Sequence, residues 1–142
     1  MWFLHIFGDN IEDYIGHFRY LFFYLAAGIV SVGAQYVINT ESAIVMIGAS
    51  GAVSGVVGAY FVLFRNSRIE AIVPTFFGVF QMVELPAWFF LGYWFIIQVF
   101  SGLGSLTTMD INMGGIAFFA HIGGFIYGFI TARSIKQKTL FT

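Results

Sequence analysis

The sequence predicts an all-α, polytopic membrane protein: a helical bundle of four full transmembrane helices, preceded by the end of an earlier one. Three observations predict this fold class. Hydrophobic residues make up 59% of the chain and charged residues only 9%, which leaves too little polar surface to coat a soluble domain. The apolar residues gather in stretches long enough to cross a bilayer. The basic residues fall in alternate connections between those stretches.

Composition also limits the possible functions. The net charge of -1 and the lack of a basic stripe argue against nucleic-acid binding. The chain has no cysteine, which excludes a disulfide framework, a thiolate metal site and a cysteine nucleophile.

The opening segment, Met1–Gly16, lacks the basic region and the small-residue cleavage site of a signal peptide. It is interpreted as the end of a membrane helix that began upstream. A spanning helix needs roughly 20 mostly apolar residues, and breaks in hydropathy divide the rest of the chain into four such stretches. These are Phe18–Ile38, Ala43–Phe64, Leu85–Phe100 and Gly114–Thr131.

The apolar run Ile69–Phe100 is too long for one span. Pro74, Gln81, Glu84 and Pro86 interrupt it. Its first half is therefore predicted to be an interfacial or re-entrant segment. Pro86 is expected in the first turn of the span that follows, where its missing N–H costs little.

Basic residues give the orientation, because they mark the cytoplasmic side of a membrane protein. They are Arg19, Arg65, Arg68, Arg133, Lys136 and Lys138. The connections Asn39–Ser42 and Ser101–Met113 carry none and are predicted to face outward, so the C-terminus is cytoplasmic. Ser50 and His121 then each lie about seven residues, or roughly 10 Å, past the outer start of a span. The two residues share one depth in the membrane.

Helical phase indicates which faces of these two spans pack together. At 100° per residue, small residues form one stripe beside Ser50. They are Gly51, Ser54, Gly55 and Gly58. Ala117, Gly124 and Gly128 form a corresponding stripe around His121. Small residues let backbones approach closely, so the simplest assembly packs these helices together and brings the hydroxyl to the imidazole.

The residues alone leave the chemistry open. A serine among glycines in a membrane helix more often packs or bonds to its own helix than reacts, and Ser54 is interpreted in that way. An ionisable residue such as His121 within a span indicates function. A metal or haem ligand would need companions, but His5 and His17 lie elsewhere. A proton relay would need carboxylates, and the spans offer only Glu84. No metal and no cofactor are predicted.

Four ordered motifs resemble the rhomboid family of intramembrane serine proteases, and the resemblance covers essentially the whole chain. Gly48-Ala49-Ser50-Gly51 is similar to the family's G-x-S-G nucleophile motif, and Ala120-His121-x-x-Gly124 with Gly128 to its catalytic-histidine motif. The opening MWFLHIFGDNIEDYIG, with Gly8 and Glu12, resembles the stretch after the family's H-x-x-x-N motif. PAWFFLGYWFIIQ, Pro86–Gln98, resembles the helix before the histidine span.

The resemblance implies a Ser–His dyad, with Ser50 as nucleophile and His121 as general base and acid. If Gly48 marks the start of the helix, the N–H groups of Ser50 and Gly51 would face the oxyanion. No carboxylate is placed to orient His121, because Asp110 lies in an outer loop. Ser54 stands where some members carry a tyrosine that packs against the histidine.

The implied protein is one rhomboid-like protease domain, residues 1–142, that lacks the family's first helix and most of the second. It would cleave transmembrane segments of membrane proteins in the lipid bilayer, in a prokaryotic cytoplasmic membrane, with no nucleic-acid partner. Because the H-x-x-x-N segment is missing, the chain as it stands is expected to be poorly active. The alternative is a catalytically inactive relative that binds client transmembrane helices. A transporter is the third hypothesis.

Overall fold

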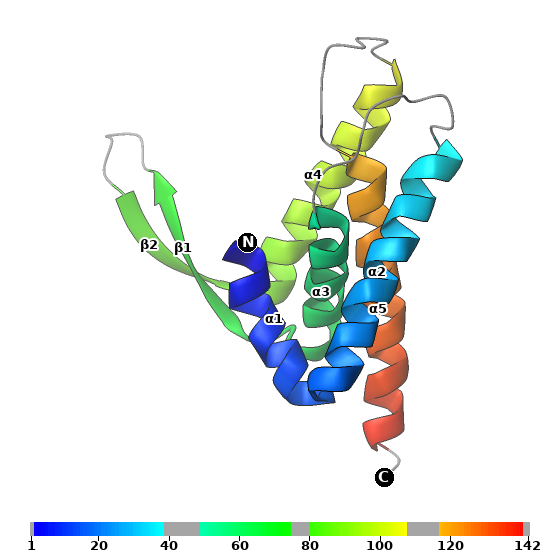
Figure 1. The fold of residues 1–142 in the computed structure, drawn as a ribbon. Helices are drawn as coiled ribbons and strands as arrows, with labels where there is room; N and C mark the ends of the chain where they lie inside the picture. The colour runs from blue at the N-terminus through cyan, green and yellow to red at the C-terminus, as the bar shows by residue number, and fades with distance from the viewer. Residues whose placement is uncertain (1, 39–48, 75–79, 108–116, 141–142) are drawn as a thin grey trace.

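The computed structural model describes residues 2–38, 49–74, 80–107 and 117–140. Its elements, in chain order, are α1 (Trp2–Ile15), α2 (His17–Ile38), α3 (Ser50–Leu63), β1 (Arg68–Pro74), β2 (Phe80–Pro86), α4 (Ala87–Thr107) and α5 (Phe118–Leu140). Helix α3 contacts all four other helices, whereas the two strands extend away from the bundle (Figure 1). The short central helix is therefore the element around which the bundle packs.

A single glycine joins the first two helices. Gly16 has a positive φ of 85°, a conformation that glycine adopts without the steric cost of a Cβ. Its N–H donates to the Glu12 carbonyl oxygen at 2.7 Å, and its own carbonyl accepts from the Tyr20 N–H at 2.9 Å. The chain therefore leaves one helix and enters the next within one residue, and α1 packs beside both α2 and α3.

Two of the described helices are long and apolar enough to cross a bilayer by length and composition, namely His17–Ile38 and Ala87–Leu106. Large apolar side chains on their outer faces are exposed, as expected of surfaces that face lipid. The most exposed are Phe18, Phe22, Ile29, Val37 and Phe100. Helix α3 is apolar but has only 14 residues, about 21 Å of helix, which is shorter than the roughly 30 Å hydrocarbon core.

The boundaries of the predicted spans differ from the helices mainly at the ends. Helix α2 matches Phe18–Ile38 closely. Helix α3 begins at Ser50, and residues 43–48 of the predicted Ala43–Phe64 span lie outside the described residues. Helix α4 continues to Thr107 and α5 to Leu140, so the predictions Leu85–Phe100, Ser101–Met113 and Gly114–Thr131 were wrong at these ends. Hydropathy marks apolar length, but helical hydrogen bonding continues into polar residues.

The structure is mostly helical, as predicted, and adds two strands to the helical bundle. The segment predicted to be interfacial or re-entrant contains an antiparallel two-stranded sheet in which Glu70 pairs with Glu84. Side chains alternate between the two faces of this sheet. One face carries four apolar residues that are all half-buried, namely Ile69, Ala71, Val83 and Leu85. On the other face Arg68 forms an ion pair with Glu84 at 2.9 Å. Period-two patterning bounded by prolines favours strand over helix.

Pro86 ends β2 instead of lying in the first turn of the next helix, as the sequence predicted. Helix α4 begins at the following residue, and its first N–H groups find acceptors in the connection after α3. The Ala87 N–H donates to the Ser67 carbonyl at 2.8 Å, and the Trp88 N–H to the Arg65 carbonyl at 3.2 Å. These bonds satisfy donors that a helix start leaves unpaired and fix α4 against the end of α3.

The closest helix contact joins α3 and α5 through glycines. A methyl group at Gly128 would overlap the carbonyl oxygen of Gly55, and one at Gly124 would overlap that of Gly51. At Gly58 a methyl group would overlap the Phe125 carbonyl oxygen. Backbone lies directly against backbone at all three points. The contact fixes the height and rotation of the two helices relative to each other.

We predict that Gly128→Ala lowers the stability of the folded protein by about 1–3 kcal/mol or more, because the added methyl must displace backbone instead of a flexible side chain. The matched control is Gly33→Ala on α2, where nothing lies within 4 Å of the added methyl. That change should be neutral or stabilising by up to about 1 kcal/mol. Thermal unfolding of the two variants in detergent makes the comparison, and equal stability of both would contradict the close contact.

Candidate active site

Ser50 stands in the first turn of α3. Ala49 is the N-cap residue and makes no side-chain capping bond, while its carbonyl accepts the N–H of Val53 at 3.0 Å. The Ser50 residue is exposed, but Gly51 and Ala52 directly after it are buried. The first N–H groups of a helix have no acceptor within it and carry the positive end of its dipole. Ser50 therefore lies where an incoming negative charge would be stabilised.

The hydroxyl of Ser50 meets the ring of His121. Ser50 Oγ lies 2.9 Å from His121 Nε2, a hydrogen bond between residues 71 apart in the chain. His121 is in the first turns of α5, where its N–H donates to the Ala117 carbonyl at 3.1 Å. Serine and imidazole at this distance are the geometry of a nucleophile with its general base.

The second serine of the motif is bonded within its own helix. Ser54 Oγ donates to the Ser50 carbonyl at 2.8 Å, and its residue is only 2% exposed. This is the i−4 back-bonding that serine makes inside helices. Ser54 is thus occupied and buried, and Ser50 is the serine that reaches the imidazole.

The other nitrogen of the His121 ring also has a partner, which the sequence reasoning missed. His121 Nδ1 lies 2.8 Å from Oε1 of Gln98 on α4. No orienting carboxylate was predicted, and the partner in the structure is a neutral amide. In the structure, Gln98 continues the buried stripe of α4 at helical spacing. That stripe consists of Ala87, Leu91, Gln98 and Gly102. Trp94, one turn before Gln98, lies with its ring centroid 6.2 Å from that of His121.

Helix α2 holds the start of α5 in place. Gln35 Oε1 accepts the N–H of Ala120 at 3.2 Å, a donor in the first turn of α5 that has no acceptor in its own helix. One turn earlier on α2, Ser31 is buried against Gly51 and donates to the Gly28 carbonyl at 2.7 Å. Helix α2 therefore touches both the helix of Ser50 and the helix of His121.

The structure brings most of the sequence-predicted site residues to one place. Ser50 and His121 are hydrogen-bonded, and the residues at the α3–α5 contact below them are Gly51, Gly55, Gly58, Gly124 and Gly128. Ala117 directly precedes α5. Gly48 lies outside the described residues.

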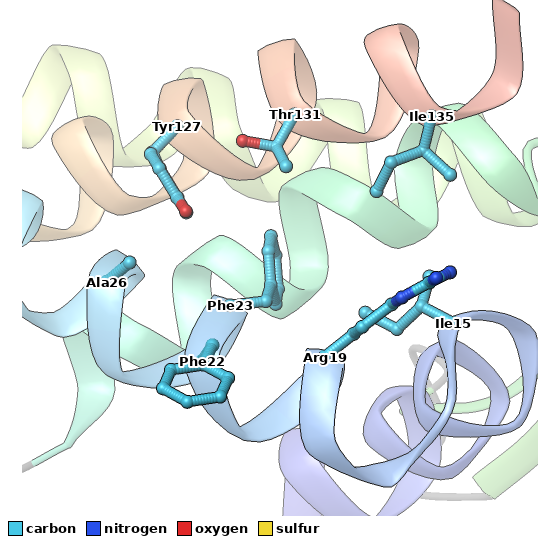
Figure 2. Close-up of a pocket in the computed structure, with 8 residues that line it drawn as sticks. All are labelled: Ile15, Arg19, Phe22, Phe23, Ala26, Tyr127, Thr131 and Ile135. Carbon is cyan, nitrogen blue, oxygen red and sulfur yellow. The ribbon is translucent and has the colours of Figure 1, made fainter. Parts of the chain in front are cut away.

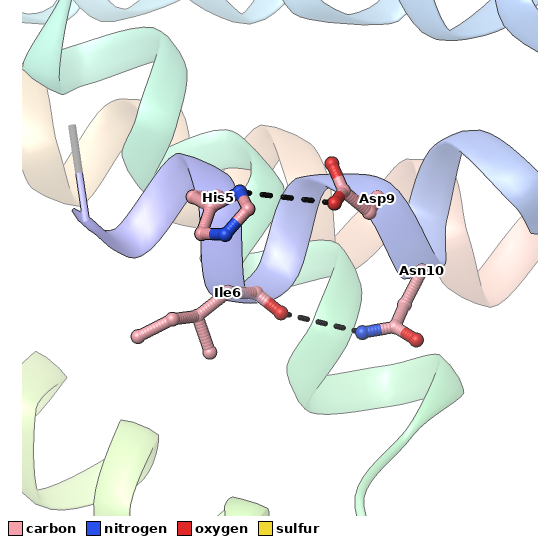
Figure 3. A network of polar contacts seen from close by, with 4 residues as sticks. All are labelled: His5, Ile6, Asp9 and Asn10. Carbon is pink, nitrogen blue, oxygen red and sulfur yellow. Dashed lines mark hydrogen bonds and ion pairs between the residues drawn. The ribbon is translucent and has the colours of Figure 1, made fainter.

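The remaining histidines lie elsewhere. His5 Nδ1 is 3.8 Å from Asp9 on the exposed side of α1, where Asn10 also bonds to the Ile6 carbonyl (Figure 3). His17 bonds to Glu12 at 2.5 Å. Within residues 2–38, 49–74, 80–107 and 117–140, no group of three or more His, Cys, Asp or Glu side chains is placed to hold a metal ion.

A groove of about 440 Å³ lies between α2 and α5, away from the serine (Figure 2). Its walls are mainly apolar, with the guanidinium of Arg19 and the hydroxyls of Tyr127 and Thr131 among them. None of its lining residues belongs to the Ser50–His121 site. The Ser50–His121 pair thus lies at the start of α3 and α5 and not in this groove.

Comparison with known proteins gives one finding. The family model described as the Rhomboid domain matches residues 1–138. Comparison with curated proteins and with solved structures gives no match.

We predict that Gln35→Met destabilises the protein by about 1–3 kcal/mol, because the N–H of the buried Ala120 loses its acceptor while the side-chain volume is nearly kept. Hydrogen exchange at the Ala120 amide should accelerate by the corresponding factor. Val37→Met, at a site on the same helix that is 77% exposed, should change neither quantity. Unchanged exchange at Ala120 in the Gln35 variant would show that this bond does not hold the start of α5.

Proposed function

Because the chain belongs to the rhomboid family, whose model matches residues 1–138, we propose that it is an intramembrane serine endopeptidase. It would cleave transmembrane segments of other membrane proteins. The observation that carries the proposal is the 2.9 Å contact between Ser50 Oγ and His121 Nε2. A protein that only binds client helices has no use for a serine and an imidazole at this distance.

In the proposed reaction, Ser50 Oγ attacks the carbonyl carbon of the scissile peptide bond while His121 Nε2 takes the hydroxyl proton. The tetrahedral intermediate collapses as the C–N bond breaks, and the imidazolium returns that proton to the leaving amine. A water molecule then attacks the acyl-serine ester, again with His121 as base. Ser50 is regenerated and the carboxylic product is released.

The developing oxyanion requires hydrogen-bond donors near Ser50. The backbone N–H groups of Ser50 and Gly51, in the first turn of α3, are the proposed donors, aided by the helix dipole. Helix α3 suits this role because it is short and begins at the nucleophile.

Placement in the membrane is part of the proposal. Members of the family are integral membrane proteins, and the described chain has two helices able to span a bilayer, α2 and α4. We propose that α3 and α5 complete four spans of one protease domain over residues 1–142. We propose a cytoplasmic C-terminus, which the positive-inside rule supports because Arg133 and Lys136 lie far along α5 from His121. The proposed location is a prokaryotic cytoplasmic membrane.

Variants of Ser50 and His121 test this function. Ser50→Ala and His121→Ala should each lower cleavage of a model transmembrane substrate in liposomes by about 10⁴-fold or more, since nucleophile and base act as a unit. Ser50→Ala should also abolish labelling by a fluorophosphonate serine probe.

Ser54→Ala is the matched control, because it removes a hydroxyl from the same helix and only one back-bond. It should keep labelling and most of the cleavage. Weak cleavage alone is expected of this chain, so labelling at Ser50 separates the two candidates: if the folded wild-type protein does not label, the inactive, client-binding alternative replaces the protease.

A further inference from the structure

We propose that Gln98 is a positioning residue for His121: its side-chain oxygen selects the imidazole tautomer that leaves Nε2 free to accept the Ser50 proton. The inference rests on the proposed protease function and deepens it. It assigns to a neutral amide on α4 the role that a carboxylate has in a catalytic triad.

The geometry points to this role because the ring of His121 is held at both nitrogens. In the described part of the chain, Ser50 Oγ is the partner of Nε2 at 2.9 Å and Gln98 Oε1 the partner of Nδ1 at 2.8 Å. A neutral imidazole carries a proton on one nitrogen and a lone pair on the other. If Nδ1 donates its proton to Gln98 Oε1, Nε2 presents its lone pair to the serine.

Burial makes the contact specific. Gln98 is 9% exposed, and an amide so placed within an apolar helix is costly unless it is hydrogen-bonded. Trp94, one turn away on the same helix, lies beside the His121 ring at a centroid distance of 6.2 Å. Helix α4 thus supplies both the acceptor at the edge of the ring and an aromatic neighbour.

A glutamine also suits the environment better than a carboxylate. A buried anion within the membrane carries a large desolvation cost, whereas the amide oxygen accepts from Nδ1–H without bearing charge. The same bond persists when His121 becomes an imidazolium, because both ring nitrogens are then donors. Gln98 can therefore hold the ring through the whole proton transfer.

The opposite orientation of the Gln98 amide makes the opposite prediction. With its NH₂ group toward Nδ1, Gln98 would select the other tautomer, in which Nε2–H donates to Ser50 and no base faces the hydroxyl. The tautomer of His121 distinguishes the two orientations of the amide and is therefore the quantity to measure. With a reversed amide, Gln98 would oppose the deprotonation of Ser50 by His121 instead of favouring it.

The experiment uses nitrogen NMR of the full chain in detergent, labelled with ¹⁵N at histidine. Only three histidines are present, and the exposed His5 and His17 are replaced by glutamine so that His121 alone reports. The variants are Gln98→Met, which keeps length without an acceptor, and Gln98→Glu, which keeps an acceptor. The rate of fluorophosphonate labelling, kcat and KM for a model substrate, and thermal unfolding are measured in parallel.

We expect wild-type His121 to be mainly the Nδ1–H tautomer above the pH at which the ring protonates. Gln98→Met should reduce that tautomer and lower kcat and the labelling rate by about tenfold, the effect of one net hydrogen bond, with KM unchanged. Gln98→Glu should restore the tautomer and much of the rate.

The inference is overturned if the wild type shows mainly the Nε2–H tautomer, a result that needs no variant to fold. It is also overturned if Gln98→Met, folded by its unfolding transition, keeps the wild-type tautomer and kcat. Failure of the protease proposal looks different: the wild type would then show no labelling at Ser50, whatever its tautomer.

Discussion

The structure depends on one contact, the approach of the α3 and α5 backbones through Gly55, Gly58, Gly124 and Gly128. In a bilayer the hydrophobic effect does not hold helices together, because lipid tails are as apolar as the side chains. Close packing must do so instead, and glycine permits the closest packing. Since Ser50 and His121 lie in the first turns of these two helices, the contact that stabilises the bundle also sets their separation.

Neighbouring helices complete the arrangement with neutral polar groups. Gln35 of α2 accepts from the first turn of α5, and Gln98 of α4 meets the far side of the imidazole. In the described residues every buried side-chain nitrogen and oxygen has a partner. Satisfied amides and hydroxyls give direction without the desolvation cost of a buried ion pair. Helices α2, α3 and α4 therefore all bond to the start of α5, and no charged side chain is buried among the described residues.

The sequence was most informative where structure follows from local geometry. Hydropathy located the helices, and rise and phase per residue placed Ser50 and His121 at one depth on facing stripes. It was least informative where partners are distant in the chain. The strands β1 and β2 could be predicted only from the alternation of inward and outward side chains, which is hard to see in an apolar run interrupted by prolines. The partnership of Gln98 with His121 depends on how α4 is rotated about its axis, which its apolar, lipid-facing residues leave nearly undetermined.

The most direct test of the account is the rate at which a fluorophosphonate probe labels Ser50 in Gly124→Ala. The added methyl would press on the carbonyl of Gly51, the residue next to Ser50, and its three nearest atoms all belong to the backbone of Gly51 and Gly55. We predict that labelling falls at least about tenfold at a temperature where the variant is folded, because a small misplacement of catalytic groups costs rate steeply. Wild-type labelling in the folded variant would contradict the claim that this backbone contact positions the dyad.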